Sequence, residues 1–346
     1  MTDLIEQRET GSQADPAIEV SVVVPILNEE AYIGPCIESI LKQDFPRERM
    51  EVLFVDGDSE DKTTAIIAQY QEKYPFIHCL HNPGRTVQLA LNIGIRAAVG
   101  EYIVRLDAHS EYADDYISQS IATLKKTGAD NVGGPMIACG KNAVQKVVAA
   151  AYHSPFALGG GKFHIADYEG YVDTVFLGAY KRQTILDLGL YDEDFPRSED
   201  DEFNMRLHAH GGKVYMTPAI KSRYYPRDSY RKVFKQYYEY GVWKVAVIKK
   251  HKKPARLSHL VPISFVLFIA VFGLLSLFFS PARWVFGGVM GLYLLLDIYF
   301  SFSNKRVKGF VNKLRLMWVH FILHISYGLG FLQGIFQFAG KTFQPV

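Results

Sequence analysis

The feature that most constrains the fold of this chain is a run of 20 residues without a charged side chain, LVPISFVLFIAVFGLLSLFF, at residues 260–279. A helix needs about 20 mostly apolar residues to cross the hydrocarbon core of a bilayer. Residues 284–303 and 316–339 are two further apolar segments. We therefore expect a transmembrane region at residues 257–340 with three hydrophobic segments. For residues 316–339, an interfacial or re-entrant helix and a buried core helix remain open alternatives, because this segment contains histidines and glycines.

Basic residues flank these segments unevenly. KKHKKPAR (249–256) and NKRVKGFVNKLR (304–315) contain five Lys or Arg each, whereas the turn SPAR (280–283) contains one. Because cytoplasmic loops are enriched in Lys and Arg, we expect residues 1–256 and the 304–315 loop inside and the C-terminal tail outside. This predicts a multi-pass protein of the inner or plasma membrane with a cytoplasmic catalytic domain. The aromatic and basic segment 231–256 suits an amphipathic helix in the headgroup layer.

The N-terminal part alternates between strands and helices. Residues 1–18 are polar and read as a flexible tail without a signal peptide. Apolar runs at 20–26, 51–56, 76–82 and 101–107 then alternate with helical stretches at 30–43, 60–73, 86–98 and 113–127. This pattern predicts an α/β domain over residues 19–230, with a Rossmann-like, mostly parallel sheet. Ligands of such sheets bind beyond the carboxyl ends of the strands.

Composition excludes several classes of protein. The chain has 38 Lys and Arg against 36 Asp and Glu, which argues against a nucleic-acid binder. Its three cysteines form no CxxC pair, so a disulfide framework or zinc ribbon is not expected, and a reducing cytoplasm fits. The first predicted strand is not followed by GxGxxG, and the chain has no Walker A motif, so the dinucleotide and P-loop fingerprints are absent.

Polar side chains follow all four predicted strands. They are Asn28 and Glu29 after the first, Asp56 and Asp58 at the end of the second, Asn82 and Arg85 after the third, and Asp107 and His109 at the end of the fourth. Any one of them is explained as a turn residue. Four strand ends that converge on one sheet edge indicate a binding site instead. Acids there suit ribose hydroxyls, a base N–H and a hard cation that carries a diphosphate.

Asp107 and His109 leave three interpretations open: a metal site, a catalytic acid–base pair and an ordinary polar turn. Mg²⁺ usually takes one or two carboxylates and leaves its other positions to water and substrate phosphate. Mn²⁺ accepts imidazole as well as carboxylate. As alternate residues, Asp107 and His109 can both reach one ion if the chain turns just after the strand.

A second acidic motif is RSEDDEFNMRLHAHGG, residues 197–212. Ser198 is the expected helix N-cap, the acids of the first turn complement the helix dipole, and Gly211 is expected to end the helix. Four adjacent carboxylates, 199–202, repel one another, so at least one is expected to have another role. A carboxylate beside other carboxylates has a raised pKa, which suits a general base.

Four quoted stretches together resemble the successive motifs of the family 2 inverting glycosyltransferases, which have a GT-A fold. They are VSVVVPILNEEAYIGPCIESIL, FVDGDSEDKT, NPGRTVQLALNIGIRAAVGEYIVRLDAH and SEDDEFNMRL, and the resemblance covers about residues 19–245. The DAH form at 107–109 and the C-terminal hydrophobic segments are most similar to the subgroup of succinoglycan-biosynthesis (ExoA-like) glucosyltransferases.

The resemblance implies roles for individual residues. Asp200 of the ED pair is the implied catalytic base, and Asp107 and His109 occupy the DxD position that binds Mg²⁺ or Mn²⁺, with a departure at the third residue. The implied nucleotide-sugar-binding residues are Pro25, Asn28, Glu29, Asp56, Asp58, Arg85 and Asp107. On the acceptor side we expect Glu199, Gln236 and Trp243; residues 236–243 stand where processive members carry QxxRW, but they lack its Arg-Trp pair.

The expected function is inverting transfer of a sugar from a nucleotide-diphosphate sugar, UDP by resemblance, to a polyprenyl-diphosphate-linked saccharide during glycan synthesis. Direct glycosylation of polyprenyl phosphate and processive polysaccharide synthesis are the alternatives within this class. A non-catalytic membrane scaffold with an inactive GT-A domain is the alternative from another class, and a transporter subunit fits three segments and an acidic crevice poorly. The expected partners are the donor, the acceptor and membrane lipids, not nucleic acid.

Overall fold

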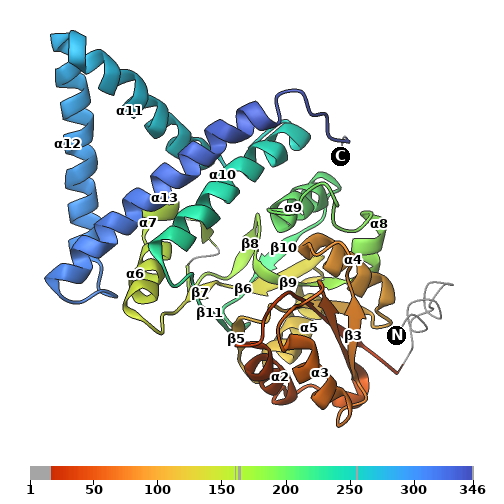
Figure 1. The fold of residues 1–346 in the computed structure, drawn as a ribbon. Coiled ribbons are helices and arrows are strands. Elements are labelled where there is room, and N and C mark those ends of the chain that lie inside the picture. Colours follow the sequence, from red (N-terminus) through yellow and green to blue (C-terminus); the bar gives the residue numbers. More distant parts are fainter. Residues whose placement is uncertain (1–16, 160, 163–164, 255, 345–346) are drawn as a thin grey trace. The chain divides into compact units, whose positions relative to one another are not determined.

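The computed structural model describes residues 17–159, 161–162, 165–254 and 256–344 (Figure 1). The predicted flexible tail lies outside these residues, apart from its last two. The chain divides into two compact units: unit 1 is Met1–Ile137 with Ile165–Tyr224, and unit 2 is Ala138–His164 with Tyr225–Val346. Residues 138–164, which fall inside the predicted 19–230 domain, thus group with the C-terminal helices.

Unit 1 is built on an eight-stranded sheet with the order β3-β2-β1-β4-β9-β6-β10-β8. Its strands are β1 Val20–Ile26, β2 Met50–Asp56, β3 Ile77–His81, β4 Tyr102–Arg105, β6 Asn131–Gly134, β8 Gly170–Val172, β9 Phe176–Lys181 and β10 Val214–Met216. β3, β2, β1 and β4 are mutually parallel, and β9 runs antiparallel to both β4 and β6. The four strands expected from the sequence are therefore parallel neighbours in a mostly parallel sheet, in which β6 and β10 also pair parallel to each other.

Helices cover both faces of this sheet (Figure 1). They are α2 Ile33–Leu41, α3 Thr63–Gln71, α4 Val87–Ala97, α5 Tyr116–Thr127, α8 Arg182–Asp187 and α9 Glu199–Ala209. Val22 and Val24 of β1 belong to the core cluster of α2 and α5, whereas Val23 belongs to the cluster of α4 and α9. Because successive side chains of β1 enter opposite cores, the strand reads as one continuous apolar run.

The strand order places a topological switch point at β1. The chain continues from β1 to β2 and β3 on one side, and β4 then pairs with the other side of β1. A crevice at the carboxyl ends of such neighbouring strands is the usual ligand site of open α/β sheets. The small sheet β5-β11-β7 (Ser110–Tyr112, Ser222–Tyr224 and Ile137–Ala138) contains β5, which follows directly after β4.

Unit 2 is helical. Its helices are α6 Ala143–Tyr152, α7 Pro155–Leu158, α10 Tyr230–His251, α11 Val261–Phe278, α12 Ser280–Ser303 and α13 Phe310–Gln337. Among the described residues, three helices are long and apolar enough to cross a membrane: Leu257–Phe278, Ser280–Ser303 and Phe310–Gln337. They match the three expected segments and indicate membrane anchoring. The third begins six residues earlier than expected and so includes Lys313 and Arg315.

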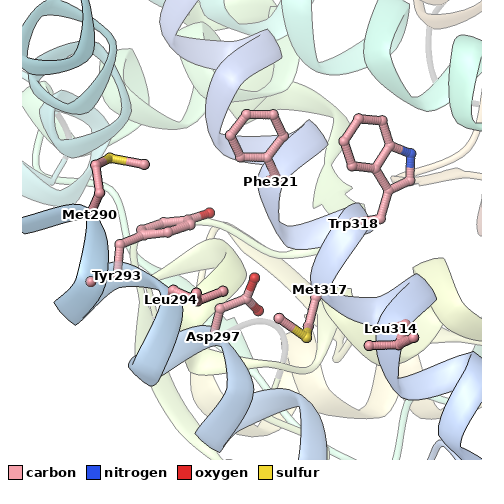
Figure 2. Close-up of a pocket in the computed structure, with 9 residues that line it drawn as sticks. Met290, Tyr293, Leu294, Asp297, Leu314, Met317, Trp318 and Phe321 are labelled. Atoms are coloured by element: carbon pink, nitrogen blue, oxygen red, sulfur yellow. The ribbon is translucent and has the colours of Figure 1, made fainter. Parts of the chain in front are cut away.

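The polar residues of the membrane segments are paired with one another. Asp297 Oδ1 of α12 lies 2.7 Å from His320 Nδ1 of α13, and the Ser301 hydroxyl donates to the same carboxylate at 3.1 Å. His324 Nδ1 and the Tyr293 hydroxyl lie 3.0 Å apart. Figure 2 shows Asp297 in a pocket of about 560 Å³ whose other lining residues are mostly apolar. Pairing offsets the cost of placing polar groups inside a bilayer.

Candidate active site

Three of the predicted site residues have a left-handed backbone. The φ angles of Asn28, Asp58 and Arg85 are 55°, 58° and 58°, and these residues follow β1, β2 and β3 respectively. Left-handed conformations are uncommon for residues other than glycine and concentrate at ligand sites, where the surrounding structure maintains them. The strain therefore marks the same sheet edge that the sequence indicated.

Asn28 ties the first two loops together. Its N–H donates to Ser59 Oγ at 2.8 Å, and its Oδ1 accepts from the N–H of Glu60 at 2.8 Å. Pro25 lies three residues earlier, opposite Val55 of β2. The register between β1 and β4 ends at Val23, so Pro25 lies beyond the last β1 residue that is paired with β4, a position where a missing N–H is tolerated.

Asp56 ends β2 with one satisfied and one unsatisfied oxygen. Its Oδ2 accepts from the N–H of Ser59 at 3.1 Å. Its Oδ1 is buried and has no hydrogen-bond partner among the described residues. A buried carboxylate oxygen without a donor is costly, so this atom is a ready acceptor for a ligand N–H or O–H.

Asp58 and Arg85 are half-exposed and engaged in surface pairs. His81 Nε2 lies 2.6 Å from Asp58 Oδ1, and Arg85 Nη2 lies 3.0 Å from Glu60 Oε1. Exposed ion pairs contribute little to stability, so both side chains can exchange these partners for a ligand at small cost.

Glu29 and His109 bring the loops after β1 and β4 together at the switch point. The Glu29 carboxylate lies 3.4 Å from His109 Nδ1, and both side chains are partly buried. The N–H of Glu29 donates to Thr63 Oγ1 at 2.8 Å, which fixes the start of this loop. His109 also packs edge-to-face against Tyr224 of β11.

Asp107 lies two residues beyond β4 with a fixed backbone. Its N–H donates to the Tyr112 hydroxyl at 2.7 Å, and that hydroxyl donates back to the Asp107 carbonyl at 2.9 Å. The described residues contain no group of three or more His, Cys, Asp or Glu placed to hold a metal ion. Asp107 and His109 supply a carboxylate and an imidazole two positions apart in the chain, and these donors suit a divalent cation that takes its remaining ligands from water and a diphosphate.

Arg105 is a further candidate site residue, which was not predicted from the sequence. It is buried at the end of β4, with Nη2 3.0 Å from Glu199 Oε1 and Nε 3.5 Å from Asp107 Oδ1. Its guanidinium thus connects the DAH motif to the acidic helix α9. The available signal was a charged residue inside the apolar strand EYIVRLD, two positions before Asp107 and therefore on the same face.

The four acids of α9 have different environments. Glu199 pairs with Arg105, and the fully buried Glu202 pairs with Arg206 at 2.9 Å, one turn later. Ser198 stands at the N-cap as expected, but with a φ of 58° and without a side-chain capping bond. Gly211, with a φ of 80°, follows the helix end at His210. Two of the four charges are therefore balanced by arginines.

Asp200 is the acid whose environment favours proton transfer. Its Oδ1 accepts from the N–H of Asp201 at 2.8 Å. Burial, together with the charges of Glu199 and Asp201, raises the pKa of Asp200 to about 7, although Arg105 acts in the opposite direction. A carboxyl with a pKa near neutral pH is partly ionised at that pH. Its ionised form can accept a proton, and the carboxylic acid that results can hold it, as a general base requires.

The two expected acceptor residues on α10, Gln236 and Trp243, belong to unit 2. Gln236 Nε2 donates to the Tyr240 hydroxyl at 3.0 Å, and the Trp243 ring packs against Phe338 with centroids 5.2 Å apart. Both side chains therefore contact aromatic residues of their own unit.

Comparison with known proteins identifies the family of this chain. The family model described as glycosyl transferase family 2 matches residues 21–185. One relative, from Methanococcus voltae, is 34% identical over 67% of this chain and 74% of its own length. It is named dolichyl N-acetyl-alpha-D-glucosaminyl phosphate 3-beta-D-2,3-diacetamido-2,3-dideoxy-beta-D-glucuronosyltransferase. The succinoglycan biosynthesis protein ExoA of Rhizobium meliloti is 27% identical over 93% of this chain and 96% of its own.

Solved structures share the fold. A mannosyltransferase from Pyrobaculum calidifontis, in complex with GDP-Man and Mn²⁺, matches 94% of this chain and 92% of its own with a TM-score of 0.63 at 20% identity. Staphylococcus aureus TarS 1-349, in complex with UDP-GlcNAc, matches 94% and 93% with a TM-score of 0.51 at 17% identity. The class is thus a nucleotide-sugar glycosyltransferase with a GT-A-like domain. The chain belongs to glycosyltransferase family 2, in glycan or polysaccharide biosynthesis.

Proposed function

We propose that this protein is an inverting glycosyltransferase that moves a sugar from a nucleotide-diphosphate sugar to a lipid-linked saccharide at the membrane. The observation that carries the proposal is Asp200, a carboxyl with a pKa near neutrality, placed beside the Arg105–Glu199 pair in the GT-A-like domain.

The donor is bound by the loops after the parallel strands. The unpartnered Oδ1 of Asp56 accepts a base N–H, and Glu29 accepts from the nucleoside. Asn28 holds the loops in register, and Arg85 leaves its surface pair with Glu60 to contact the diphosphate. A uridine diphosphate sugar is the expected donor, by resemblance to the family.

Asp107 and His109 would hold the divalent cation, with Mn²⁺ or Mg²⁺ as the candidates. The cation, when bound, supplies positive charge that stabilises the leaving diphosphate. The partial exposure of both side chains leaves them open toward a ligand. Arg105 Nε lies 3.5 Å from Asp107 Oδ1, so the guanidinium can help to orient this carboxylate toward the cation.

The reaction is a single in-line displacement. Asp200 takes the proton from an acceptor hydroxyl, and that oxygen attacks the anomeric carbon from the face opposite the diphosphate. The bond between the anomeric carbon and the diphosphate oxygen breaks as the new glycosidic bond forms. The configuration inverts, so an α-linked donor gives a β-linked product.

The lipid-linked acceptor is supported by two observations. Three helices of this chain have the length and composition of membrane spans. The M. voltae relative is named for transfer to a dolichyl-linked N-acetylglucosaminyl phosphate. Confining the enzyme to the membrane raises its effective concentration toward an acceptor confined there. By the positive-inside rule, the catalytic domain faces the cytoplasm.

The test is transfer by the purified full-length protein in detergent. A panel of UDP-, GDP- and dTDP-sugars is offered with a lipid extract, in Mg²⁺, in Mn²⁺ and in EDTA. We expect one donor to yield a lipid-linked product, and we expect Asp107→Ala and EDTA to abolish it. Activity that survives both EDTA and His109→Ala would remove the cation from the mechanism. A chain that consumes no donor, or an Asp200→Asn variant that keeps full function, would favour a membrane scaffold.

A further inference from the structure

The three apolar helices of unit 2 differ in their surroundings. In helices Leu257–Phe278 and Ser280–Ser303, only 11% of the most apolar 18-residue stretch is buried within the protein. In helix Phe310–Gln337 the buried share is 50%. Residues such as Leu274, Leu277, Leu292 and Leu295 leave α11 and α12 apolar on almost all sides. A helix that is apolar all round suits the bilayer interior, whereas a half-covered helix needs another explanation.

The helix that covers α13 is too polar to enter a bilayer. α10 carries seven charged residues among its 22: Arg231, Lys232, Lys235, Glu239, Lys244, Lys249 and Lys250. α10 and α13 lie side by side in Figure 1 and make the most extensive helix–helix contact of the unit. Since charged side chains are costly at the bilayer centre, α10 belongs at the membrane surface or outside it.

The contact between α10 and α13 is too close to allow different depths. A Cβ on Gly330 would lie 2.0 Å from the Tyr238 carbonyl oxygen, and one on Gly334 would lie 2.6 Å from that of Val242. On α10, a Cβ on Gly241 would lie 2.1 Å from the Tyr327 carbonyl oxygen. The two backbones are thus in contact over glycines, so the C-terminal half of α13 lies at the depth of α10.

Both ends of α13 are held by basic segments. At its start, Lys313 of α13 belongs to the basic segment 304–315, and its Nζ donates to the Phe302 carbonyl at the end of α12 at 3.1 Å. At its end, Lys249 Nζ donates to the Phe338 and Ala339 carbonyls, the latter at 2.8 Å. Lys249 belongs to the basic segment 249–256 that precedes α11. The positive-inside rule assigns both segments to the same side of the membrane.

The exposed face of α13 carries an apolar stripe flanked by exposed polar residues, among them Arg315 and Gln333. Val311, Leu314, Trp318, Leu329 and Phe336 are exposed, and their spacing places them on one side of the helix, opposite the glycines that contact α10. One apolar stripe beneath a polar partner is the pattern of a helix that lies in the membrane surface.

We propose that α13 lies in the headgroup layer beneath α10, with this stripe toward the acyl chains, and that only the α11–α12 hairpin crosses the bilayer. The chain beyond residue 338 then lies on the same side as segment 249–256, not on the opposite side as three spans would require. The proposal does not depend on the sugar donor or on the reaction.

Impermeant-maleimide labelling of single cysteines tests this arrangement. The background is the full chain without its native thiols, Cys36→Ser, Cys79→Ser and Cys139→Ser. Thr342→Cys reports the end of the chain, Lys305→Cys the 304–315 loop, and Ser280→Cys the turn between α11 and α12; all three positions are exposed. Each variant is labelled in right-side-out and in inside-out vesicles.

We expect Thr342→Cys and Lys305→Cys to be labelled in the same vesicle orientation and not in the other. Ser280→Cys should be labelled only in the opposite orientation. Thr342→Cys that reacts together with Ser280→Cys would show that α13 spans the bilayer and would overturn the proposal. Cys36 is buried in the core of unit 1, so its replacement can impair folding. Protease accessibility of a tag after residue 346, on a chain with its native cysteines, then gives the same two outcomes.

Discussion

At the scale of single residues, the site depends on how six charges share one small volume. Arg105 lies between Asp107 and Glu199, and Arg206 neutralises Glu202. Burial and the acidic neighbours Glu199 and Asp201 raise the pKa of Asp200 to about 7. The arrangement favours one base among several carboxylates.

Replacement of this base gives the first prediction. Asp200→Asn should lower kcat by roughly 10²- to 10⁴-fold, the usual contribution of a positioned general base. Donor binding should change little, because the proposed donor contacts lie on the loops after β1 to β4. Transfer rates and donor affinity measured on the same preparations check this. Asp187→Asn on α8, an exposed carboxylate with a Gln183 partner, is the matched control and should behave as wild type.

The same carboxyl links stability to pH. Its folded-state pKa of about 7 exceeds the ordinary value of 3.8, so its contribution to stability is fully present below pH 3.8 and is lost as the pH rises through about 7. Asp200→Asn cannot ionise. The variant should therefore unfold at a higher temperature than wild type at pH 8 and at a similar one near pH 4. An equal difference in unfolding temperature between variant and wild type at pH 4 and at pH 8 would contradict the assigned environment of Asp200.

Arg105→Met tests the guanidinium that opposes this shift. Without its charge, the pKa of Asp200 should rise further, so the pH at half-maximal rate moves upward. The buried Glu199 and the partly buried Asp107 also lose their partner, which should cost about 3–5 kcal/mol of stability. A pH–rate profile together with thermal unfolding measures both effects. Arg105→Lys keeps the charge and should shift the profile less; an unshifted profile in Arg105→Met would remove Arg105 from the site.

Residue roles could be predicted only in part from the sequence. The residues after β1 to β4 were identifiable because parallel strands end at one edge. The ion pair of Arg105 with Glu199 could not be predicted from the sequence, because it joins residues 94 positions apart. The partners of Asp58 and Arg85, His81 and Glu60, likewise depend on how the loops fold over one another.

At the scale of elements, the paired helices α10 and α13 depend on glycine. Gly330→Leu would drive a side chain into the Tyr238 carbonyl. We expect a loss of about 1–3 kcal/mol, as for other overpacked contacts, or separation of the two helices. Gly288→Leu on α12 is the matched control, because no atom lies within 4 Å of its added Cβ. Thermal unfolding in detergent compares them, and equal stability of the two variants would contradict the close contact.

Strong periodicity made most elements predictable. β1 to β4 and the helices between them were expected within a few residues, because buried parallel strands are nearly continuous apolar runs. The start of α13 was not predicted correctly, because Lys313 and Arg315 interrupt its apolar pattern. The grouping of residues 138–164 with the C-terminal helices was also hidden, because it results from tertiary contacts such as that between α6 and α13.

At the scale of the whole molecule, anchoring by α11 and α12 predicts resistance to extraction. The protein should stay in the membrane fraction after washes with 1 M salt and with alkaline carbonate. Salt at this concentration shortens the Debye length to about 3 Å and so screens charge contacts with the headgroups. The reason is that a hairpin of two apolar helices, unlike a basic surface helix, is held by hydrocarbon burial. Release by carbonate would show that the chain only lies on the surface.

The most direct measurement for the central claim is the anomeric configuration of the newly formed bond. Product made from an α-linked donor would be isolated, and its anomeric proton coupling measured by NMR. A single displacement with Asp200 as base predicts a β-linkage. An α-linkage would mean that configuration is retained, and would contradict both the proposed displacement and the role assigned to Asp200.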